Sequence, residues 1–331
     1  MSSTGPLLVS DLFVGEKYDA RKGLKGWELS GFDDSSWKRV RRKDYGYSNL
    51  FAQIGEPVRE VSVFEPSRIK ISSDGDVIID VGQNLAGYLS FQVEATEGEV
   101  IRLEYTEVLD ENGRFCRNIM GANKDQTDVY IAKNGRQSYC SSFTYHGFRY
   151  VRLSGWPGIP EVEDFKVHVV ATDMENTGIF ITSNEKLNRL QQNIRWSQIS
   201  NTVSITTDCP QREKAGWTGD VIVSAPWTLY QAFANKSILE ENYKAMKHWM
   251  KYVQYCAENE FPEEYETFDE DRKKRQKYLW NTGFHYGDWL VPSSVLNTDN
   301  DMAMINSAYR TKGIVAPAYY ACFIIVRAKK P

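Results

Sequence analysis

The sequence predicts a multidomain β-plus-α protein, in which an N-terminal antiparallel β-sandwich is followed by a domain of packed helices. Before about residue 170, apolar and polar residues alternate in short segments separated by polar turns, which indicates strands. Near Asp173 the apolar spacing changes to steps of three and four residues, which is typical of helices. A length of 331 residues allows two domains or slightly more.

The strand predictions depend on period-two alternation and on turn sequences. Leu89, Phe91 and Val93 alternate with polar residues, and residues 101–105 repeat this pattern. Gly75, Gly113 and Gly135 each lie in a polar turn sequence. Regularly spaced short strands of this kind are typical of an antiparallel sandwich. Further strands are predicted at residues 77–81, 129–131, 150–153 and 165–169.

The helical part is predicted from a capping signal and from apolar stripes. Ser183 and Asn184 are good N-cap residues directly before Glu185, and Leu187, Leu190 and Ile194 then share one helical face. Residues 239–253 form a second amphipathic stripe, and residues 221–233 between them are apolar on nearly all sides. Alternating buried and amphipathic helices favour a helical hairpin array or an (α/α) barrel. Residues 258–277 are strongly charged and are predicted to form a solvated loop.

Composition narrows the class of protein and its partners. The 44 acidic and 40 basic residues nearly balance, so charge gives no reason to expect nucleic acid or an anionic membrane as a partner. We find neither a signal peptide at the N-terminus nor an apolar run of roughly 18 residues. The five cysteines are scattered without metal-ligand spacing, which favours free thiols in a reducing compartment. A cytoplasmic protein is expected, and its oligomeric state stays open.

One segment, residues 207–220, concentrates groups that could perform chemistry. From residue 208 onward it holds three carboxylates, one guanidinium and one indole, and its proline and glycines predict a loop. Glycoside hydrolysis needs a proton donor and a second carboxylate on the opposite face of the sugar ring. Asp208 and Asp220 would favour the protonated form of Glu213, whereas Arg212 and Lys214 would favour its ionised form. Residue types alone also allow an ordinary polar loop that caps the following helix.

The sequence TDCPQREKAGWTGD at residues 207–220 resembles the signature of glycoside hydrolase family 78, the bacterial α-L-rhamnosidases. Two segments near the N-terminus, GEKYDAR and GFDDSSW, are similar to the lectin-like domain of the same family. The similarity runs from about residue 11 to about residue 310, and many matches in one order make coincidence an unsatisfactory explanation. The other matching segments, in order, are residues 80–87, 105–110, 146–151, 196–198 and 287–290.

The resemblance implies roles for individual side chains. Glu213 corresponds to the general acid of the family, and Asp208 and Asp220 correspond to aspartates that bind rhamnose hydroxyls. Arg212 and Trp217 correspond to residues that line the same subsite. We expect these five side chains to converge on one pocket for a deoxyhexose ring.

Two further candidates and the ligand expectations follow from the same resemblance. Asp288 and Trp289 are second-rank substrate-binding residues, with a helix start and a buried indole as the alternative. The expected partner is a rhamnose-containing glycoside or oligosaccharide. No cofactor is implied and no metal site is predicted, although some relatives bind calcium. The implied domains are a lectin-like remnant and linker at 1–60, a β-sandwich at 61–172 and the first part of an (α/α)6 barrel at 173–331.

The general base is where the sequence departs from the family. Members invert the anomeric configuration and place the base more than about two hundred residues after the acid, whereas this chain ends at Pro331. We therefore expect an incomplete barrel and a chain shortened at both ends, with little or no hydrolase activity alone. The alternative function is a non-catalytic or vestigial carbohydrate-binding protein.

Several matching segments are predicted to be structural. Residues 80–87 are expected to be a strand end and turn, and Arg149 is expected to form an ion pair. His168 is interpreted as a satisfied histidine facing outward from a strand, and His248 as a surface residue of a helix. The glutamates at 263, 264 and 266 are interpreted as a solvated charge run and not as a replacement base.

Overall fold

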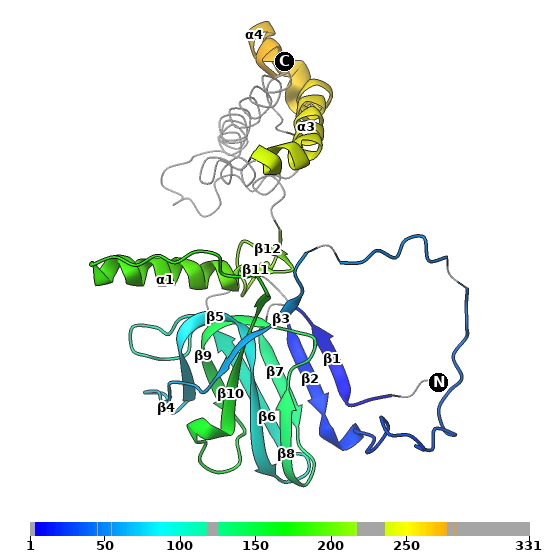
Figure 1. Ribbon diagram of the computed structural model, residues 1–331, viewed down its shortest axis with the longest axis vertical. Coiled ribbons are helices and arrows are strands. Elements are labelled where there is room, and N and C mark those ends of the chain that lie inside the picture. The colour runs from blue at the N-terminus through cyan, green and yellow to red at the C-terminus, as the bar shows by residue number, and fades with distance from the viewer. Residues whose placement is uncertain are drawn as a thin grey trace. The chain divides into compact units, whose positions relative to one another are not determined.

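The computed structural model describes residues 4–44, 46–53, 55–117, 125–216, 236–276 and 282. These residues divide into two units, of which the first ends at Gly216 and the second begins at Trp217 (Figure 1). The first unit holds the strands and one long helix, and the second unit holds helices.

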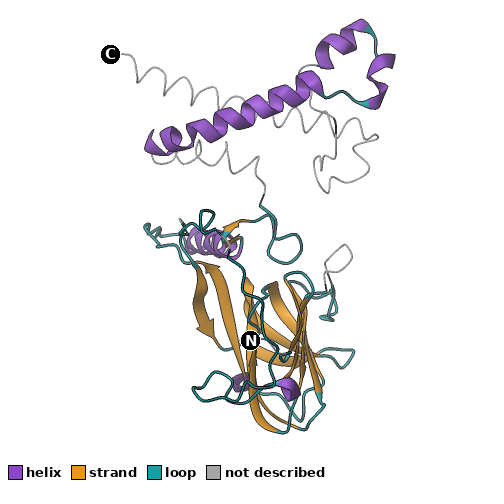
Figure 2. Cartoon of the chain, turned by 90° about the vertical axis from the view of Figure 1, so that its right-hand side faces the viewer, coloured by secondary structure: helices purple, strands orange, loops and turns teal. Residues whose placement is uncertain are grey.

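The described strands of the first unit curl into facing layers (Figures 1 and 2). The ten-stranded sheet has the order β1-β2-β7-β6-β9-β5-β10-β3, with β4 and β8 also paired to β5. The N-terminal strands are β1 (Leu7–Asp11), β2 (Gly15–Asp19), β3 (Val58–Phe64), β4 (Arg68–Ile71) and β5 (Val77–Ala95). The later strands are β6 (Val100–Thr106), β7 (Thr127–Ile131), β8 (Gly135–Cys140), β9 (His146–Ser154) and β10 (Phe165–Thr172).

Strand β5 contributes to both layers. Its first half pairs with β4 and its second half with β8 and β10, while β9 pairs with both halves. The register shifts between Asp80 and Leu85, where Gly82 has a φ of 93° that favours glycine. The strands predicted at 77–81 and 89–95 are confirmed, but the turn predicted for residues 80–87 is wrong. That segment is an irregularity inside one long strand, because β9 continues to pair on both sides of it.

The sandwich core is built from the alternate residues that the sequence pattern identified. Leu89, Phe91 and Val93 of β5 are buried, as are the apolar residues of β6 that face them. Each fully buried large apolar side chain stabilises the fold by roughly 1.5–3 kcal/mol relative to an exposed one. Other members of this core are Ile79, Leu85, Ile101, Leu103, Tyr105, Phe148, Val151, Leu153, Phe165, Val167 and Val169.

One strand pair departs from the predicted antiparallel arrangement. Strand β2 runs parallel to β7, with Lys17 beside Val129 and Asp19 beside Ile131. Gly15 permits this close approach, because a Cβ atom there would lie only 2.3 Å from the carbonyl oxygen of Thr127. Strands β1 and β2 therefore belong to the same sheet as the strands that follow residue 60.

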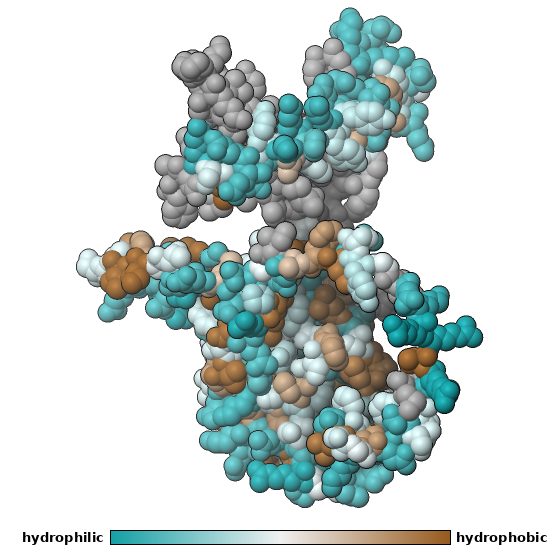
Figure 3. All heavy atoms as spheres, turned by 45° about the vertical axis from the view of Figure 1, so that its right-hand side comes forward, coloured by the Kyte–Doolittle hydropathy of each residue, from teal (hydrophilic) through white to brown (hydrophobic). Residues whose placement is uncertain are grey.

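Helix α1 (Glu185–Ser200) follows the sandwich and begins where the capping signal predicted. The Asn184 side chain accepts a hydrogen bond from the Lys186 backbone N–H at 3.0 Å. The apolar residues that contact the sandwich are Trp196 and Ile199, on the side of the helix opposite to the predicted stripe. The members of the stripe, Leu187, Leu190 and Ile194, are about half exposed. Figure 3 shows hydrophobic atoms on the surface of the first unit. A short hairpin of β11 (Thr202–Val203) and β12 (Ile205–Thr206) comes next.

In the second unit one predicted helix is confirmed, and one predicted loop is wrong. Helix α3 (Lys236–Asn259) buries Leu239 and Met246, as the stripe at 239–253 predicted, and His248 is exposed. The charged segment predicted to be a loop contains the 3-10 helix η4 (Glu263–Thr267) and helix α4 (Glu270–Gln276). Asp269 explains this, because its carboxylate accepts the Arg272 backbone N–H at 2.7 Å and so caps the charged helix.

The apolar helix predicted at residues 221–233 lies outside the described residues. Within the described part of the chain, no helix combines the length and the apolar character needed to cross a membrane.

Candidate active site

The candidate site is a loop, residues 207–216, whose two ends lie side by side after β12. The Asp208 backbone N–H donates to the Ala215 carbonyl oxygen at 3.2 Å, and the Lys214 N–H donates to the Cys209 oxygen at 3.1 Å. Before them, the Thr207 N–H donates to the Asn201 carbonyl oxygen at 2.7 Å and ties the loop to the end of α1. These short-range bonds give the loop a defined shape, as the proline and glycine signals predicted.

The loop brings together three of the predicted site residues. Carboxylate oxygens of Asp208 and Glu213 and the Cys209 sulfur all lie within 4.8 Å of one another. Arg212 Nη2 lies 3.0 Å from Glu213 Oε1, and both side chains are only about one-sixth exposed, at 16% and 17%. The site therefore holds two neighbouring carboxylates beside one guanidinium.

The two carboxylates share a hydrogen bond. Burial raises the pKa of Asp208, but hydrogen bonds from the Glu213 side chain, from Cys209 and from the Ala215 N–H outweigh it and lower that pKa. A hydrogen bond between two carboxyl groups needs one proton, so the pair holds one proton and one negative charge. The Arg212 guanidinium lies beside Glu213 and partly balances this charge.

Lys214 does not point toward the carboxylates. Its ammonium group donates to the carbonyl oxygens of Leu12 and Tyr145 and lies 4.4 Å from the centre of the Tyr145 ring. Burial lowers the pKa of Lys214 to about 7. The residue directly after Glu213 is therefore an anchor into the sandwich, and the sequence-based expectation that it acts on Glu213 directly is not supported by its position.

A second anchor is the close packing of the loop against β9. A Cβ atom on Gly147 would lie 2.6 Å from the Gln211 nitrogen and 2.8 Å from two atoms of Pro210. Only glycine leaves room for the loop backbone at this distance. Gly147 lies in the segment 146–151 that matches the family, but nothing in the sequence identified the loop as its neighbour.

Beneath these anchors lies a buried polar network centred on Asp128. Its carboxylate accepts from the Ser141 hydroxyl at 2.8 Å, the Tyr105 hydroxyl at 3.0 Å and the Glu16 backbone N–H at 2.9 Å, and it contacts His146 Nε2 at 3.1 Å. Burial lowers the pKa of His146, so the neutral imidazole donates to Asp128. His146 is therefore a structural residue directly next to Tyr145, the residue that binds Lys214.

The remaining predicted site residues fall elsewhere. Trp217, Asp220, Asp288 and Trp289 lie outside the described residues, so the expected five-residue pocket is represented here by Asp208, Arg212 and Glu213. The ion pair predicted for Arg149 is present, with Nε 3.1 Å from Asp80 Oδ1.

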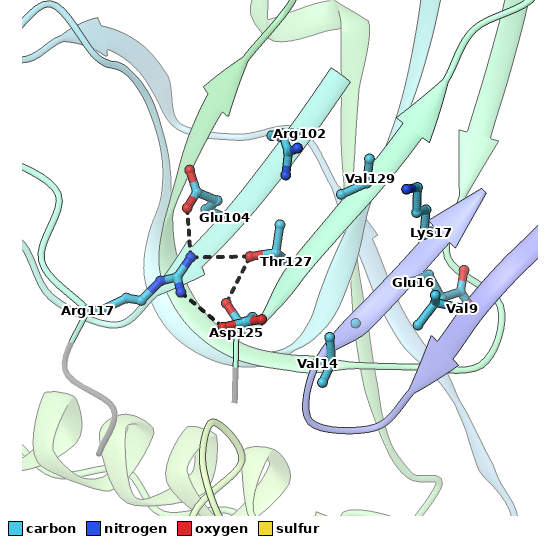
Figure 4. Close-up of a pocket in the computed structure, with 11 residues that line it drawn as sticks. Val9, Val14, Glu16, Lys17, Arg102, Glu104, Arg117, Asp125, Thr127 and Val129 are labelled. Atoms are coloured by element: carbon cyan, nitrogen blue, oxygen red, sulfur yellow. Dashed lines mark hydrogen bonds and ion pairs between the residues drawn. The ribbon is translucent and has the colours of Figure 1, made fainter. Parts of the chain in front are cut away.

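A groove of about 320 Å³ on the sandwich offers a different kind of environment (Figure 4). Arg117 bonds Glu104 at 2.7 Å and Asp125 at 3.3 Å, and Arg152 also pairs with Glu104. The third lining carboxylate, Glu16, accepts the backbone N–H groups of Ser142 and Phe143. Every carboxylate that lines this groove is thus already paired, and the groove is a poor source of a proton donor.

Comparison with family models covers most of the chain in three consecutive matches. Residues 1–62 match an alpha-L-rhamnosidase N-terminal domain, and residues 70–171 match a bacterial alpha-L-rhamnosidase concanavalin-like domain. Residues 175–225 and 219–318 match a bacterial alpha-L-rhamnosidase 6 hairpin glycosidase domain. The chain belongs to the bacterial α-L-rhamnosidase family.

Individual rhamnosidases show the same relationship. The chain is 35% identical to an alpha-L-rhamnosidase of Formosa agariphila and 38% identical to one of Streptomyces avermitilis, over 69% of its length in each case. The solved alpha-L-rhamnosidase from Dictyoglumus thermophilum aligns with a TM-score of 0.75 at 30% identity, covering 98% of this chain and 41% of that one. The Streptomyces avermitilis enzyme complexed with L-rhamnose aligns with a TM-score of 0.71 at 27% identity, covering 98% and 36%.

The chain spans about a quarter of the length of the two curated rhamnosidases just named, at 24% and 22%. The candidate loop falls within the residues matched by the rhamnosidase six-hairpin domain. Its anchors, Leu12 and Tyr145, fall within the matches to the N-terminal and concanavalin-like domains. In this rhamnosidase family member, three matched regions therefore contribute to the position of one loop.

Proposed function

We propose that this chain carries the acid-bearing part of an inverting α-L-rhamnosidase that cleaves terminal rhamnose from glycosides. The observation that supports this most directly is the pairing of Asp208 with Glu213, in which one proton is shared and Arg212 lies beside it. Residues 173–331 then form the first part of an (α/α)6 barrel, which fits the match of residues 175–318 to the rhamnosidase six-hairpin glycosidase domain.

The proposed reaction uses these groups in defined roles. Glu213 donates its proton to the glycosidic oxygen as the bond from that oxygen to the anomeric carbon breaks. A water molecule attacks the anomeric carbon from the opposite face and gives its proton to a general base, which we do not assign to any described residue. Asp208 and Asp220 accept hydrogen bonds from rhamnose hydroxyls, Arg212 and Trp217 line the same subsite, and Asp288 and Trp289 are secondary candidates.

Two unpartnered buried atoms next to the carboxylates also fit a polyhydroxylated ligand. Among the described residues, Arg212 Nε and Gln211 Oε1 are buried without a hydrogen-bond partner. Leaving such a group unpaired costs about 1–3 kcal/mol, which the hydroxyls of a bound sugar would offset. The relative from Streptomyces avermitilis was solved in complex with L-rhamnose, which supports rhamnose as the sugar.

The test measures how fast the purified chain hydrolyses p-nitrophenyl rhamnoside and a rhamnose-terminated disaccharide. Binding of L-rhamnose to the same chain is measured by calorimetry. Where turnover is measurable, Glu213→Gln lowers it by about 10²–10⁴-fold on the disaccharide and by less on the aryl glycoside, whose leaving group needs little protonation. Equal losses on both substrates contradict the assignment of the acid.

A second candidate function, a non-catalytic carbohydrate-binding protein, is favoured because no general base is assigned in the described residues. It predicts rhamnose binding that Asp208→Ala abolishes and Asp33→Ala, a change at an exposed loop aspartate, leaves intact. Binding without turnover selects this second function, and a chain that neither binds nor hydrolyses rhamnosides contradicts both.

A further inference from the structure

Four adjacent strands place a second group of reactive side chains on the outer face of the sandwich, away from the candidate loop. Ser90 of β5 lies directly opposite Cys140 of β8, and His168 of β10 lies opposite Tyr88 of β5. The residues that alternate with them, such as Leu89, are buried in the core. The side chains of Ser90, Cys140 and His168 therefore share the face that is directed away from the core.

The imidazole of His168 is held in one orientation. Its Nδ1 lies 3.0 Å from Glu60 Oε2 and its Nε2 lies 2.8 Å from the Ser90 hydroxyl, while Tyr88 donates to Glu60 Oε1 at 2.7 Å and stacks on the imidazole. The Glu60 carboxylate only accepts, so Nδ1 carries the proton when no ion is bound. A cation between Glu60 and His168 would replace this proton, and Nε2–H would then donate to Ser90, the kind of second contact that orients a metal-bound imidazole.

A thiol completes the set. One ligand atom each from Glu60, Cys140 and His168 lies within 4.8 Å of the other two. Tetrahedral zinc, with bonds of about 2.0–2.3 Å, requires donor atoms roughly 3.5 Å apart, and the two residues that would have to move closer, Cys140 and Glu60, are both exposed. We propose that Cys140, His168 and Glu60 bind a divalent cation of the zinc class on this face, with the fourth position open to solvent.

The donor set decides which cations suit the site. Thiolate and imidazole ligands favour zinc and its borderline-soft neighbours, whereas magnesium and calcium prefer oxygen ligands alone. The three groups stand on the paired strands β3, β8 and β10, so little order has to be created when the ion binds.

A serine nucleophile triad places a serine, a histidine and a carboxylate in a row, as Ser90, His168 and Glu60 are placed here. That use is disfavoured because Ser90 lies within a strand that is paired on both sides, with Lys166 and with Cys140. Its backbone is part of the sheet ladder and offers no free N–H for an oxyanion. A metal site uses the side chains alone and does not require such a donor.

The test uses the whole chain stripped of metal, titrated with Zn²⁺ by calorimetry and with Co²⁺ by absorption spectroscopy. Cobalt bound through a thiolate gives a sulfur-to-metal charge-transfer band, which reports the cysteine ligand directly. We expect one zinc equivalent that Cys140→Ser and His168→Asn each weaken by more than about 100-fold, and Glu60→Gln by about 10–100-fold.

Two other cysteines provide matched controls. Cys116→Ser changes a thiol outside the cluster, and Cys209→Ser changes the thiol of the only other group of potential ligands found among the described residues. Both variants should retain the charge-transfer band and the zinc affinity. No thiolate band in the parent chain, a band that survives Cys140→Ser, or a band lost with Cys209→Ser would each overturn the proposal, whatever the outcome for rhamnoside hydrolysis.

Discussion

The ammonium group of Lys214 lies 2.5 Å from the backbone carbonyl oxygen of Tyr145, and this contact joins the acid-bearing loop to the β-sandwich. The next residue along β9 is His146, which is bonded to the buried carboxylate of Asp128. The position of Glu213, one residue before Lys214, thus depends on how the backbone of the sandwich holds Lys214.

Lys214 makes the stability of the fold depend on pH. Burial lowers its pKa to about 7, whereas an unfolded lysine has a pKa of about 10.4. Between these values the unfolded chain binds more protons, so the free energy of unfolding rises with pH by up to about 1.4 kcal/mol per pH unit. Below the pKa that Lys214 has in the folded protein, the lysine is charged in both states, and the free energy of unfolding is reduced by the full cost of burying an ammonium group.

Lys214→Met should remove this slope when urea unfolding is followed from pH 7 to pH 9. At pH 9, where the folded lysine is neutral, the variant should also be less stable than the parent chain, because the Leu12 and Tyr145 carbonyl oxygens lose their donor. Lys186→Met, a change at an exposed helix position, should leave the slope as it is. The assignment fails if Lys214→Met and the parent chain show parallel pH profiles.

Gly147→Ala should displace the loop. The added methyl group meets backbone atoms of Pro210 and Gln211 at 2.6–2.8 Å, and we expect a loss of about 1–3 kcal/mol in the free energy of unfolding. Rhamnose binding should weaken at the same time, because Asp208 and Glu213 move with the loop. Gly178→Ala is the control, since nothing lies within 4 Å of a Cβ atom there; similar effects of the two changes would contradict the packing argument.

Asp128→Asn should destabilise the sandwich by about 3–5 kcal/mol. An amide cannot accept from all the donors that surround this carboxylate, and its own N–H groups would face the Ser141 and Tyr105 hydroxyls. Asp125→Asn changes an aspartate whose side chain is 58% exposed and paired only with Arg117, so about 0–1 kcal/mol is expected. Chemical denaturation of the two variants measures the difference, and equal losses would show that burial of Asp128 is not the cause.

Asn184→Ala should cost about 1 kcal/mol of stability. The variant loses the side-chain oxygen that accepts the Lys186 N–H at the start of α1. Gln191→Ala, in the exposed middle of the same helix, should change stability by no more than a few tenths of a kcal/mol because alanine favours helix. Helix content and unfolding midpoints of both variants check this, and an unchanged midpoint for Asn184→Ala would exclude a capping role.

Much of the fold was predictable because its signals are local. Period-two alternation identified the second half of β5 and β6, and the Ser183–Asn184 pair located the start of α1. Further short strands were predicted within the first half of β5 and within β7, β9 and β10. Signals that depend on distant partners were misread. The stripe of α1 was identified, yet the residues that contact the sandwich are Trp196 and Ile199, on the opposite side of the helix.

The candidate site divides in the same way. Sequence motifs placed Asp208, Arg212 and Glu213 in one short loop, and the structure brings their side chains together, while their roles stay predictions. The motifs were not enough to show that Lys214 turns away from the acid, that Gly147 makes room for Pro210, or that Glu60, Cys140 and His168 meet across four strands. Those relationships join residues far apart in sequence, and only the pairing of strands and the packing of the loop onto them bring such residues within contact distance.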